Sequence, residues 1–282
     1  MPDLSIITVT HQSAEYIEDL IVSVISGALK ISTEHLIVDN ASTDGTVALI
    51  ERNFSSFVTV IKNAENRGFS AANNQAFAKA RGRYILFLNP DMKVEDGSLD
   101  RFVEWMDGHP DVGIGGCKLV DPYGEFLVYR APLYFPRWGR NLLWLISPIF
   151  CRGHCEWDPQ CRQEKQVDAI LGAFMLTRRS FLEKLGFAFD PRYFLTFEDI
   201  DLCREAKRLG YKVMYCPEIR CIDYNSRSFY QKKFLWIYRQ VSKGMYIYYR
   251  KWEPWYIWIL IALLRPVGYA IRYLLPKKRS CN

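Results

Sequence analysis

Two acidic sites in the sequence could support chemistry. Asp91 ends the segment YILFLNPD, in which an apolar run is followed by Asn89 and Pro90. Glu198 and Asp199 are adjacent in the segment FLTFEDIDLC. A carboxylate at the end of a strand can hold a divalent cation, which prefers oxygen ligands. Two adjacent carboxylates can raise the pKa of one of them towards the range of a general base.

These acids need a scaffold, and the first 121 residues predict one by alternating strand and helix patterns. Apolar, strand-like runs occupy residues 4–10, 35–40, 58–63, 84–91 and 112–121. Helical patterns lie between them, at about residues 14–29, 43–54, 70–81 and 98–109. This alternation predicts an α/β fold with a mainly parallel sheet that is covered by helices on both faces.

Polar residues follow the first four predicted strands. They are Thr8 to His11, Asp39 and Asn40, Asn63 to Gly68, and Asn89 to Asp91. Because ligands bind beyond the carboxyl ends of such strands, a polar ligand is expected at this edge. The chain lacks GxGxxG after the first strand, GxxxxGK[ST] and GxSxG. These absences argue against a dinucleotide site, a P-loop NTPase and the usual hydrolase elbow.

Residues 122–167 are less regular, and we interpret them as a loop-rich insertion with an apolar patch at 142–150. The insertion also contains CRGHCEWDPQC, in which Cys151, His154, Cys155 and Cys161 could bind zinc. Their spacing is not a paired CxxC pattern, which favours ordinary reduced thiols. Regular patterns return at 169–180, at a polar helix over 198–210, and at one or two strands over 211–224.

The C-terminal part of the chain has a composition of its own. From Tyr224 onward there are twelve Lys or Arg residues and one acid, Glu253, which gives +11. The whole chain is +6, so residues 1–223 carry −5. The apolar run WYIWILIALL is too short to span a bilayer and is followed by Arg265 and Pro266. Basic and aromatic residues together favour a helix lying in the membrane interface, with a C-terminal helix packed on the body as the alternative.

The start of the chain, MPDLSIITVT, has an early Asp and no basic segment before its apolar run. We therefore expect no export signal and a cytoplasmic protein on the inner face of the cell membrane. The composition, 49% hydrophobic and 24% charged, is that of a globular protein. We expect no nucleic-acid partner.

Six segments in order carry a family resemblance: SIITVTHQSAEYI, IVDNASTDGT, NRGFSAANNQA, FLNPD, GAFMLTRRS and YFLTFEDIDLCREAKRLGY. Over residues 3–230 the chain resembles a family 2 glycosyltransferase with the GT-A fold, of the bacterial rhamnosyltransferase-like branch that builds surface polysaccharides. The resemblance implies a catalytic domain at 1–223, with a nucleotide-sugar half at 1–121, an acceptor half at 122–223 and the tail at 224–282.

The implied reaction transfers a sugar, with inversion, from a nucleoside diphosphate to a hydroxyl of a glycan or lipid-linked glycan. The first donor suggested by the resemblance is dTDP-rhamnose, and UDP-hexoses are the second. A sugar-1-phosphate nucleotidyltransferase would need a Gly-rich basic loop near the N-terminus, which TVTHQSAEY does not provide. A catalytically inactive glycan-binding or scaffold protein is the alternative outside enzymes, and the intact Asp91, Glu198 and Asp199 argue against it.

By resemblance, a set of polar residues contacts the nucleotide sugar. These residues are Thr8, Thr10, Asp39, Asn66, Arg67, Gly68, Asn73 and Asn89. A carboxylate at Asp39 suits the imide N–H of uracil or thymine, and its alternative role is to cap the following helix. Asn74, beside Asn73, could support the same contact or be an ordinary polar helix residue.

The resemblance assigns the metal to Asp91, the last acid of a DxD motif. Mg²⁺ or Mn²⁺ held there would neutralise the leaving diphosphate. The first acid of that motif is Asn89 here, which weakens the charge at the site. Asp223 stands where the family often has a histidine, so we hypothesise that it is a second metal ligand. The plain alternative is that Asp91 and Asp223 are acids of strand-end turns.

The resemblance assigns the general base to Asp199, with Glu198 beside it. A one-step inversion needs a base on the side of the sugar opposite the leaving group. Acids at a helix N-terminus also favour the helix dipole, and that structural role is our interpretation of Asp201. Gly172 and Ala173 would border the acceptor pocket, where small side chains leave room for a sugar.

Overall fold

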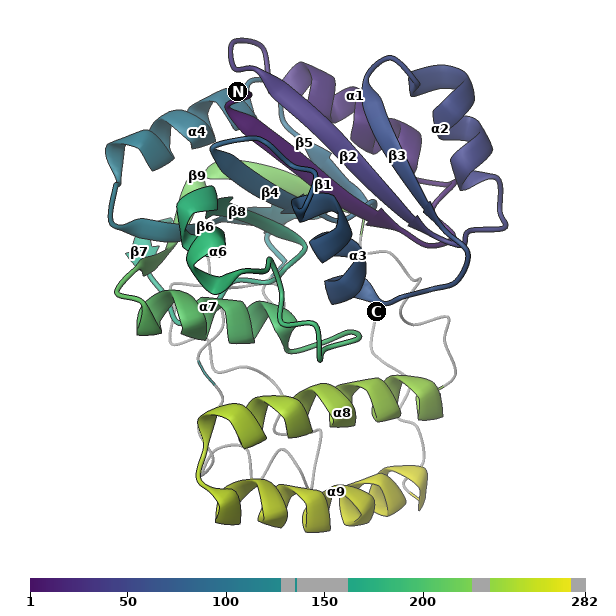
Figure 1. The fold of residues 1–282 in the computed structure, drawn as a ribbon, viewed down its shortest axis with the longest axis vertical. Helices are drawn as coiled ribbons and strands as arrows, with labels where there is room; N and C mark the ends of the chain where they lie inside the picture. Colours follow the sequence, from purple (N-terminus) through teal and green to yellow (C-terminus); the bar gives the residue numbers. More distant parts are fainter. Residues whose placement is uncertain (128–134, 136–161, 225–233, 275–282) are drawn as a thin grey trace.

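The protein is described here from a computed structural model, which covers residues 1–127, 135, 162–224 and 234–274. The apolar patch at 142–150 and the candidate zinc ligands Cys151, His154, Cys155 and Cys161 lie outside these residues. The described part contains a sheet with a helical layer on each face and a pair of helices below it (Figure 1).

The sheet has nine strands in the order β3-β2-β1-β4-β8-β6-β9-β5, with β7 paired to β9. Their bounds are β1 Leu4–Thr10, β2 Thr33–Asn40, β3 Val58–Asn63, β4 Tyr84–Leu88, β5 Met92–Val94, β6 Val112–Val120, β7 Lys165–Gln166, β8 Phe174–Arg178 and β9 Lys212–Asp223. The strands β3, β2, β1 and β4 are parallel, whereas β8 is antiparallel to both β4 and β6. The predicted α/β class is confirmed, and the sheet is mixed where β8, β5 and β7 join it.

Helices cover both faces of this sheet. On one face lie α1 (Ile17–Gly27), α2 (Thr46–Phe54) and α4 (Ser98–Gly108), and on the other lie α3 (Phe69–Phe77), α6 (Arg179–Leu185) and α7 (Glu198–Arg208). Each face has its own apolar core, because the strands carry buried side chains on both sides. Neighbouring residues of β4 show this, since Leu86 belongs to the first core and Phe87 to the second.

The segment YILFLNPD forms a strand and then a sharp corner. All five residues of β4 are buried, and the strand ends before Asn89. After Pro90 the chain continues as β5, a three-residue strand that pairs antiparallel with β9. The strand pattern alone did not predict β5, because three residues are too few for an alternation to be recognised.

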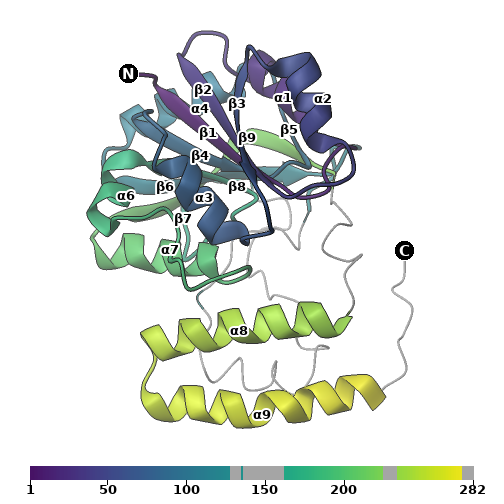
Figure 2. The same ribbon diagram turned by 45° about the vertical axis from the view of Figure 1, so that its right-hand side comes forward.

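Two C-terminal helices form a separate layer. They are α8 (Phe234–Trp252) and α9 (Trp255–Leu274), which run side by side below α7 (Figure 2). The helix α9 continues through Arg265 and Pro266, the two residues that follow the apolar run. A proline removes a single helical hydrogen bond. Arg265 turns inward, and its guanidinium donates to the Ser242 hydroxyl of α8 at 2.7 Å. Among the described helices, none is both long and apolar enough to cross a membrane.

Candidate active site

The ends of β1 and β2 form a buried polar contact. The Thr10 hydroxyl donates to Asp39 Oδ1 at 2.7 Å, and the Ser42 N–H donates to Asp39 Oδ2 at 2.8 Å. Asp39 is buried, yet it does not cap α2. The first N–H of α2, that of Thr46, is instead accepted by Asp44 Oδ1 at 3.1 Å. The contacts of Asp39 therefore hold its carboxylate in one orientation at the end of β2.

Thr8 lies deeper in the sheet than Thr10. Its hydroxyl is fully buried and lies 3.0 Å from His35 Nε2. Burial lowers the pKa of His35 to about 3, so this imidazole is neutral in the folded protein. The contact with His35 places Thr8 inside the scaffold beneath the polar edge, whereas Thr10 contacts Asp39 at that edge.

Asn40 connects β2 to the loop that follows β3, a role that the sequence pattern did not predict. Its amide donates to the carbonyl of Gly68 at 3.2 Å. Its Oδ1 accepts the side-chain amide of Asn63 at 2.9 Å and the N–H of Arg67 at 3.4 Å. Asn40 therefore fixes the loop predicted to contact ribose and phosphates, although its partners are more than twenty residues away in the sequence.

The loop of Asn66 to Gly68 brings one buried and two exposed residues to this edge. Asn66 Oδ1 accepts the Gly68 N–H at 2.9 Å, and the side chains of Asn66 and Arg67 are exposed. Gly68 has a φ of +82°, and a Cβ placed on it would lie 2.6 Å from the carbonyl oxygen of Phe194. Only glycine combines this backbone conformation with so close an approach. The exposed Arg67 is the cation that this loop offers to an anionic ligand.

Asn73 and Asn74 have different environments. The Asn73 amide is buried in α3 and donates to the carbonyl of Phe69 at 2.9 Å. Asn74 makes two hydrogen bonds with the backbone of Phe189. Its side-chain amide donates to the Phe189 carbonyl at 2.7 Å, and its Oδ1 accepts the Phe189 N–H at 3.0 Å. Asn74 also accepts the N–H of Ala188 at 2.9 Å. Asn74 thus ties α3 to the segment that precedes α7.

The segment Gly172 and Ala173 joins the two acidic sites. The Asn89 N–H donates to the Ala173 carbonyl at 3.0 Å, and the Gly172 N–H donates to Asp199 Oδ2 at 3.0 Å. A Cβ on Gly172 would lie 3.4 Å from the Cβ of Asp199. The end of β4 and the start of α7 therefore lie on either side of this segment, although they are far apart in the sequence.

Asp91 and Asp223 are neighbours through the pairing of β5 and β9. The Tyr224 N–H donates to the Asp91 carbonyl at 3.0 Å, and Asp223 pairs with Met92. Both carboxylates are buried, Asp91 at 4% and Asp223 at 0% exposure. Side chains of paired residues share one face of a sheet. The register therefore places Asp223 on the face of Met92, which belongs to the core beneath α1.

The donor set at this corner is limited to two carboxylates. No group of three Asp, Glu, His or Cys residues that could hold a metal occurs among the described residues. Mg²⁺ and Mn²⁺ need more oxygen ligands than two carboxylates provide, and both ions commonly take the others from phosphates and water. A cation at this corner would therefore have to take most of its ligands from a bound diphosphate and water.

Glu198 and Asp199 have contrasting environments. Burial, followed by the neighbouring charge of Asp199, raises the pKa of Glu198 well above its ordinary value. Asp199 accepts the N–H groups of Gly172 at 3.0 Å and Ile200 at 2.8 Å, and it lies in the first turn of α7. N–H donors and a helix N-terminus both stabilise a carboxylate. The two neighbouring acids therefore differ: burial favours the protonated form of Glu198, whereas N–H donors and the helix N-terminus stabilise the carboxylate of Asp199.

The backbone just before this pair is strained. Thr196 and Phe197 have φ values of 73° and 72°. Non-glycine residues seldom adopt this left-handed conformation, and two in succession need support from their surroundings. They turn the chain sharply into α7 and so set the direction in which Glu198 and Asp199 leave the loop. The sequence FLTFED contains no glycine or asparagine that would have predicted this turn.

Comparison with known proteins gives one family. The family described as Glycosyl transferase family 2 matches residues 5–186. A similar protein is the N-acetylglucosaminyl-diphospho-decaprenol L-rhamnosyltransferase of Mycobacterium tuberculosis, 26% identical over 249 residues, or 80% of this chain and 77% of the relative. Another is the rhamnosyltransferase WbbL of Escherichia coli, 27% identical over 182 residues, or 60% of this chain and 66% of the relative.

Solved structures show the same fold at low identity. The mannosyltransferase PcManGT of Pyrobaculum calidifontis, in complex with GDP-Man and Mn²⁺, has a TM-score of 0.62 at 19% identity and covers 99% of this chain and 76% of its own. TarS of S. aureus, in complex with UDP-GlcNAc, has a TM-score of 0.56 at 16% identity, over 86% of this chain and 66% of its own. GalNAc-T7, with UDP, GalNAc and Mn²⁺, has a TM-score of 0.59 at 16% identity, over 79% of this chain and 44% of its own. These likenesses confirm the predicted GT-A fold.

Proposed function

This chain belongs to glycosyl transferase family 2, and from that membership we propose that it moves a sugar from a nucleoside diphosphate to an acceptor hydroxyl with inversion. The family resemblance given by the six sequence motifs is thereby confirmed. We further propose that the product is part of a cell-surface polysaccharide. The two relatives found by sequence are rhamnosyltransferases, which supports rhamnose as the first donor sugar to test.

One structural observation gives the main support for the proposed reaction. Two hydrogen bonds connect the segment 172–173 to the two acidic sites. The Gly172 N–H donates to Asp199, and the Ala173 carbonyl accepts the N–H of Asn89, two residues before Asp91. An inverting transfer needs a base on one side of the sugar and charge neutralisation at the leaving group on the other. This arrangement provides both groups around a segment without bulky side chains.

We assign the general base to Asp199. Its carboxylate would take the proton of the acceptor hydroxyl as the new glycosidic bond forms. Burial and the charge of Asp199 raise the pKa of Glu198, which favours the protonated form of Glu198 and reduces the repulsion between the two acids. Gly172 and Ala173 leave the space next to Asp199 open for the acceptor.

We assign the nucleotide to the edge formed by β1, β2 and the loop after β3. Asp39, which is held by Thr10 and Ser42, would accept the N–H of a pyrimidine base. Asn66, Arg67 and Gly68 would border the ribose and the phosphates, and Asn89 and Asn73 lie in the elements next to them. Thr8 and Asn73 support this edge through buried hydrogen bonds.

We propose that Asp91 holds a divalent cation together with the donor diphosphate, with Asp223 as the second candidate ligand. A bound cation would neutralise the charge of the leaving diphosphate. The two structural relatives in complex with Mn²⁺ support this proposal. Asp91 is the stronger candidate, because the register places Asp223 beside Met92.

A donor panel tests the function. The purified protein with Mg²⁺ or Mn²⁺ would be incubated with dTDP-rhamnose, UDP-glucose, UDP-GlcNAc and GDP-mannose, and the released nucleoside diphosphate measured with and without a lipid-linked glycan acceptor. We expect release to be greatest with dTDP-rhamnose and to depend on the acceptor. Release with a UDP-hexose alone would replace rhamnose by that sugar. Binding without any release would favour the inactive glycan-binding alternative.

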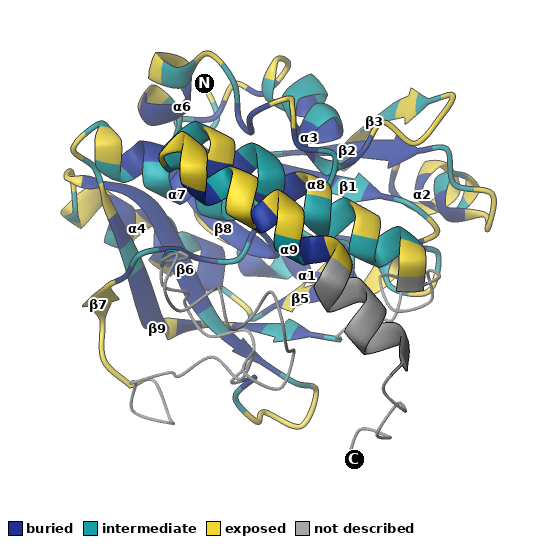
Figure 3. Cartoon of the chain, turned by 90° about the horizontal axis from the view of Figure 1, so that it is seen from below, coloured by how far each residue is buried: buried dark blue, intermediate teal, exposed yellow. Residues whose placement is uncertain are grey.

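The outer face of α9 supports a second proposal, that the enzyme docks on a membrane surface. Trp255, Tyr256, Leu260 and Leu263 are exposed at 67%, 56%, 38% and 67%, along a helix whose other face packs on α8. Figure 3 shows this exposed side of α9 from below. An exposed apolar stripe in a segment of net charge +11 matches an anionic lipid surface. Because Arg265 turns towards α8, it does not interrupt the stripe.

Replacing Leu260 and Leu263 together by Ser should release the protein from anionic vesicles. Burying one leucine side chain is worth about 1.5–3 kcal/mol, so we expect lipid partitioning to fall by about tenfold or more. Flotation with vesicles of phosphatidylglycerol and phosphatidylcholine measures the bound fraction. Point substitutions are preferable to a truncation after Trp252, which would uncover the core that Ile257 and Ile261 form with α8.

Leu29→Ser is the matched control for flotation. Leu29 is as exposed as Leu263, at 69%, but it lies next to α1, away from α8 and α9. This variant should float like the unmodified protein. Equal flotation of the double variant and the control would reject α9 as the docking surface. Raising the salt concentration should weaken binding of the unmodified protein, since anionic lipid attracts the basic tail over about one Debye length.

A further inference from the structure

The segment of residues 186–197 lies between the nucleotide half of the protein and the C-terminal helices. We call it the 186–197 loop. On one side, Phe189 bonds with Asn74 and the Phe194 carbonyl accepts the N–H of Phe69 at 2.7 Å. On the other side, Tyr193 is buried against Tyr248 in a cluster with residues of α8 and α9. The loop ends at the strained pair that starts α7.

The first contact of α8 with this loop is unusually close. A Cβ placed on Gly244 of α8 would lie 2.4 Å from the carbonyl oxygen of Thr196 and 2.9 Å from its hydroxyl. Glycine lowers helix stability, so its presence in α8 needs a reason, and this approach provides one. Phe197 contacts Tyr248 of the same helix, with ring centroids 5.7 Å apart. Helix α8 thus packs against both strained residues.

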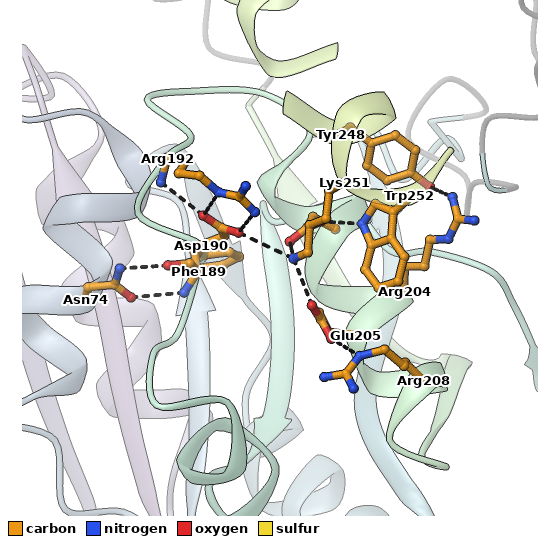
Figure 4. Close-up of polar contacts among 11 residues, drawn as sticks. Asn74, Phe189, Asp190, Arg192, Arg204, Glu205, Arg208, Tyr248, Lys251 and Trp252 are labelled. Carbon is orange, nitrogen blue, oxygen red and sulfur yellow. Dashed lines mark hydrogen bonds and ion pairs between the residues drawn. The ribbon is translucent and has the colours of Figure 1, made fainter. Parts of the chain in front are cut away.

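The second contact is a buried ionic cluster. The ammonium of Lys251 lies 2.7 Å from Asp201, 2.8 Å from Glu205 and 3.4 Å from Asp190, so it bridges α7 and the 186–197 loop (Figure 4). The indole N–H of Trp252 also donates to Asp201, at 2.6 Å. All three acids are buried, and Lys251 is 17% exposed.

The neighbouring arginines that pair with these acids do not replace the buried ammonium of Lys251. Arg192 pairs with Asp190 at 2.6 Å and Arg208 pairs with Glu205 at 2.6 Å, but both guanidinium groups are more than half exposed. Asp201, the residue that the sequence suggested as structural, has Lys251 as its cation partner. Burial lowers the pKa of Lys251, but its bonds to Asp201 and Glu205 outweigh that effect, so its pKa is raised and it stays charged.

From these contacts we propose that α8 positions the general base. Gly244 and Lys251 are positioning residues: Gly244 supports the left-handed turn at Thr196, and Lys251 fixes the first turns of α7 through Asp201 and Glu205. Together they set where Asp199 lies relative to Gly172. This inference rests on the proposed role of Asp199. It assigns to the C-terminal helices a part in the reaction that is separate from contact with lipid.

The proposal predicts a specific kinetic defect in Gly244→Ala and Lys251→Met. The added methyl group would push the Thr196 carbonyl, and the methionine would leave Asp201 and Glu205 without their buried cation. Misplacing a catalytic group by about 1 Å can cost about a hundredfold in rate. We expect kcat to fall by about tenfold or more in both variants, with the donor KM changed less than about threefold.

Hydrogen exchange provides a measurement that does not depend on activity. The amides of Gly172 and Ile200 both donate to Asp199. We expect them to exchange faster in both variants, whereas the amides of β1 and β4 keep their protection. Lys243→Met is the matched control, because Lys243 is exposed on the same helix. It should leave kcat and exchange unchanged. If Lys251→Met does not fold, Gly244→Ala alone carries the test.

The outcomes separate this inference from the proposed function. Unchanged kcat and unchanged exchange at Gly172 and Ile200 in Gly244→Ala would overturn the positioning role. Equal acceleration of amide exchange throughout the sheet would also overturn the positioning role, because a uniform change indicates a loss of global stability. If the unmodified protein shows no transfer with any donor, the proposed function fails, and the exchange measurement still decides whether α8 holds Asp199 in place.

Discussion

Asp199→Asn should lower kcat by about 10²- to 10⁴-fold, the usual contribution of a positioned general base. Asparagine has nearly the same shape, and its side-chain oxygen can still accept the N–H of Gly172. It cannot take the proton of the acceptor hydroxyl. The loss should therefore appear in kcat with the donor KM nearly unchanged. Steady-state transfer to a saturating acceptor measures this, with the donor chosen from the panel.

The pH profile distinguishes the loss of a base from a general disturbance. In the unmodified enzyme, kcat/KM should fall on the acidic side as the base becomes protonated, and this limb should disappear in Asp199→Asn. Glu198→Gln is the matched control. Burial and the Asp199 charge raise the pKa of Glu198, so a neutral amide should replace it with a rate loss of no more than about tenfold. Turnover that survives Asp199→Asn would remove Asp199 as the base.

The pattern of elements in residues 1–121 could be predicted because each strand is a short, nearly continuous apolar run that ends in polar residues. The parallel strands β1 to β4 follow from that pattern. The place of β8 did not follow from it. A five-residue strand with four buried residues does not reveal its direction in the sequence. Its insertion between β4 and β6 depends on pairing with residues far away in the sequence.

The candidate site, like the fold, could be predicted from the sequence only in part. The motifs predicted which acids are candidates for the site, because a carboxylate in a strand-end or helix-start position is visible in the sequence. They did not predict which residues hold the segments around these acids. Asn40 and Asn74 are ordinary polar residues by type, and Lys251 belongs to a tail whose charge favoured membrane contact. Their partners are 23 to 115 residues away, so no local spacing could reveal them.

The basic C-terminal tail shows that composition alone does not determine what each helix contacts. A basic, aromatic segment predicted either membrane contact or packing on the body. In the structure, α8 packs on the 186–197 loop and α7, while α9 presents an apolar face outward. Packing on the body describes α8, and membrane contact stays a prediction for the outer face of α9. Through the contacts of Gly244 and Lys251, a pair of helices that meets lipid would also be the one that supports Asp199.

Asp91→Asn should lower metal-supported turnover by about 10²- to 10³-fold, the scale for losing one electrostatic contact to a charge that develops in the transition state. Because residue 89 is already an asparagine, the substitution removes the carboxylate that follows β4 and leaves Asp223 as the remaining candidate ligand. We also expect the concentration of Mn²⁺ at half-maximal activity to rise. Titration of metal into protein treated with EDTA, at a fixed donor concentration, measures both effects.

Two companion variants make this prediction specific. Asn89→Asp adds a second acid beside Asp91 and should lower the Mn²⁺ concentration at half-maximal activity, because a further carboxylate strengthens the attraction for a cation. Asp223→Asn decides the role of the other acid. A metal requirement unchanged in Asp223→Asn leaves Asp223 a buried residue of the β5–β9 corner. A requirement unchanged in Asp91→Asn would mean that the corner after β4 does not hold the metal.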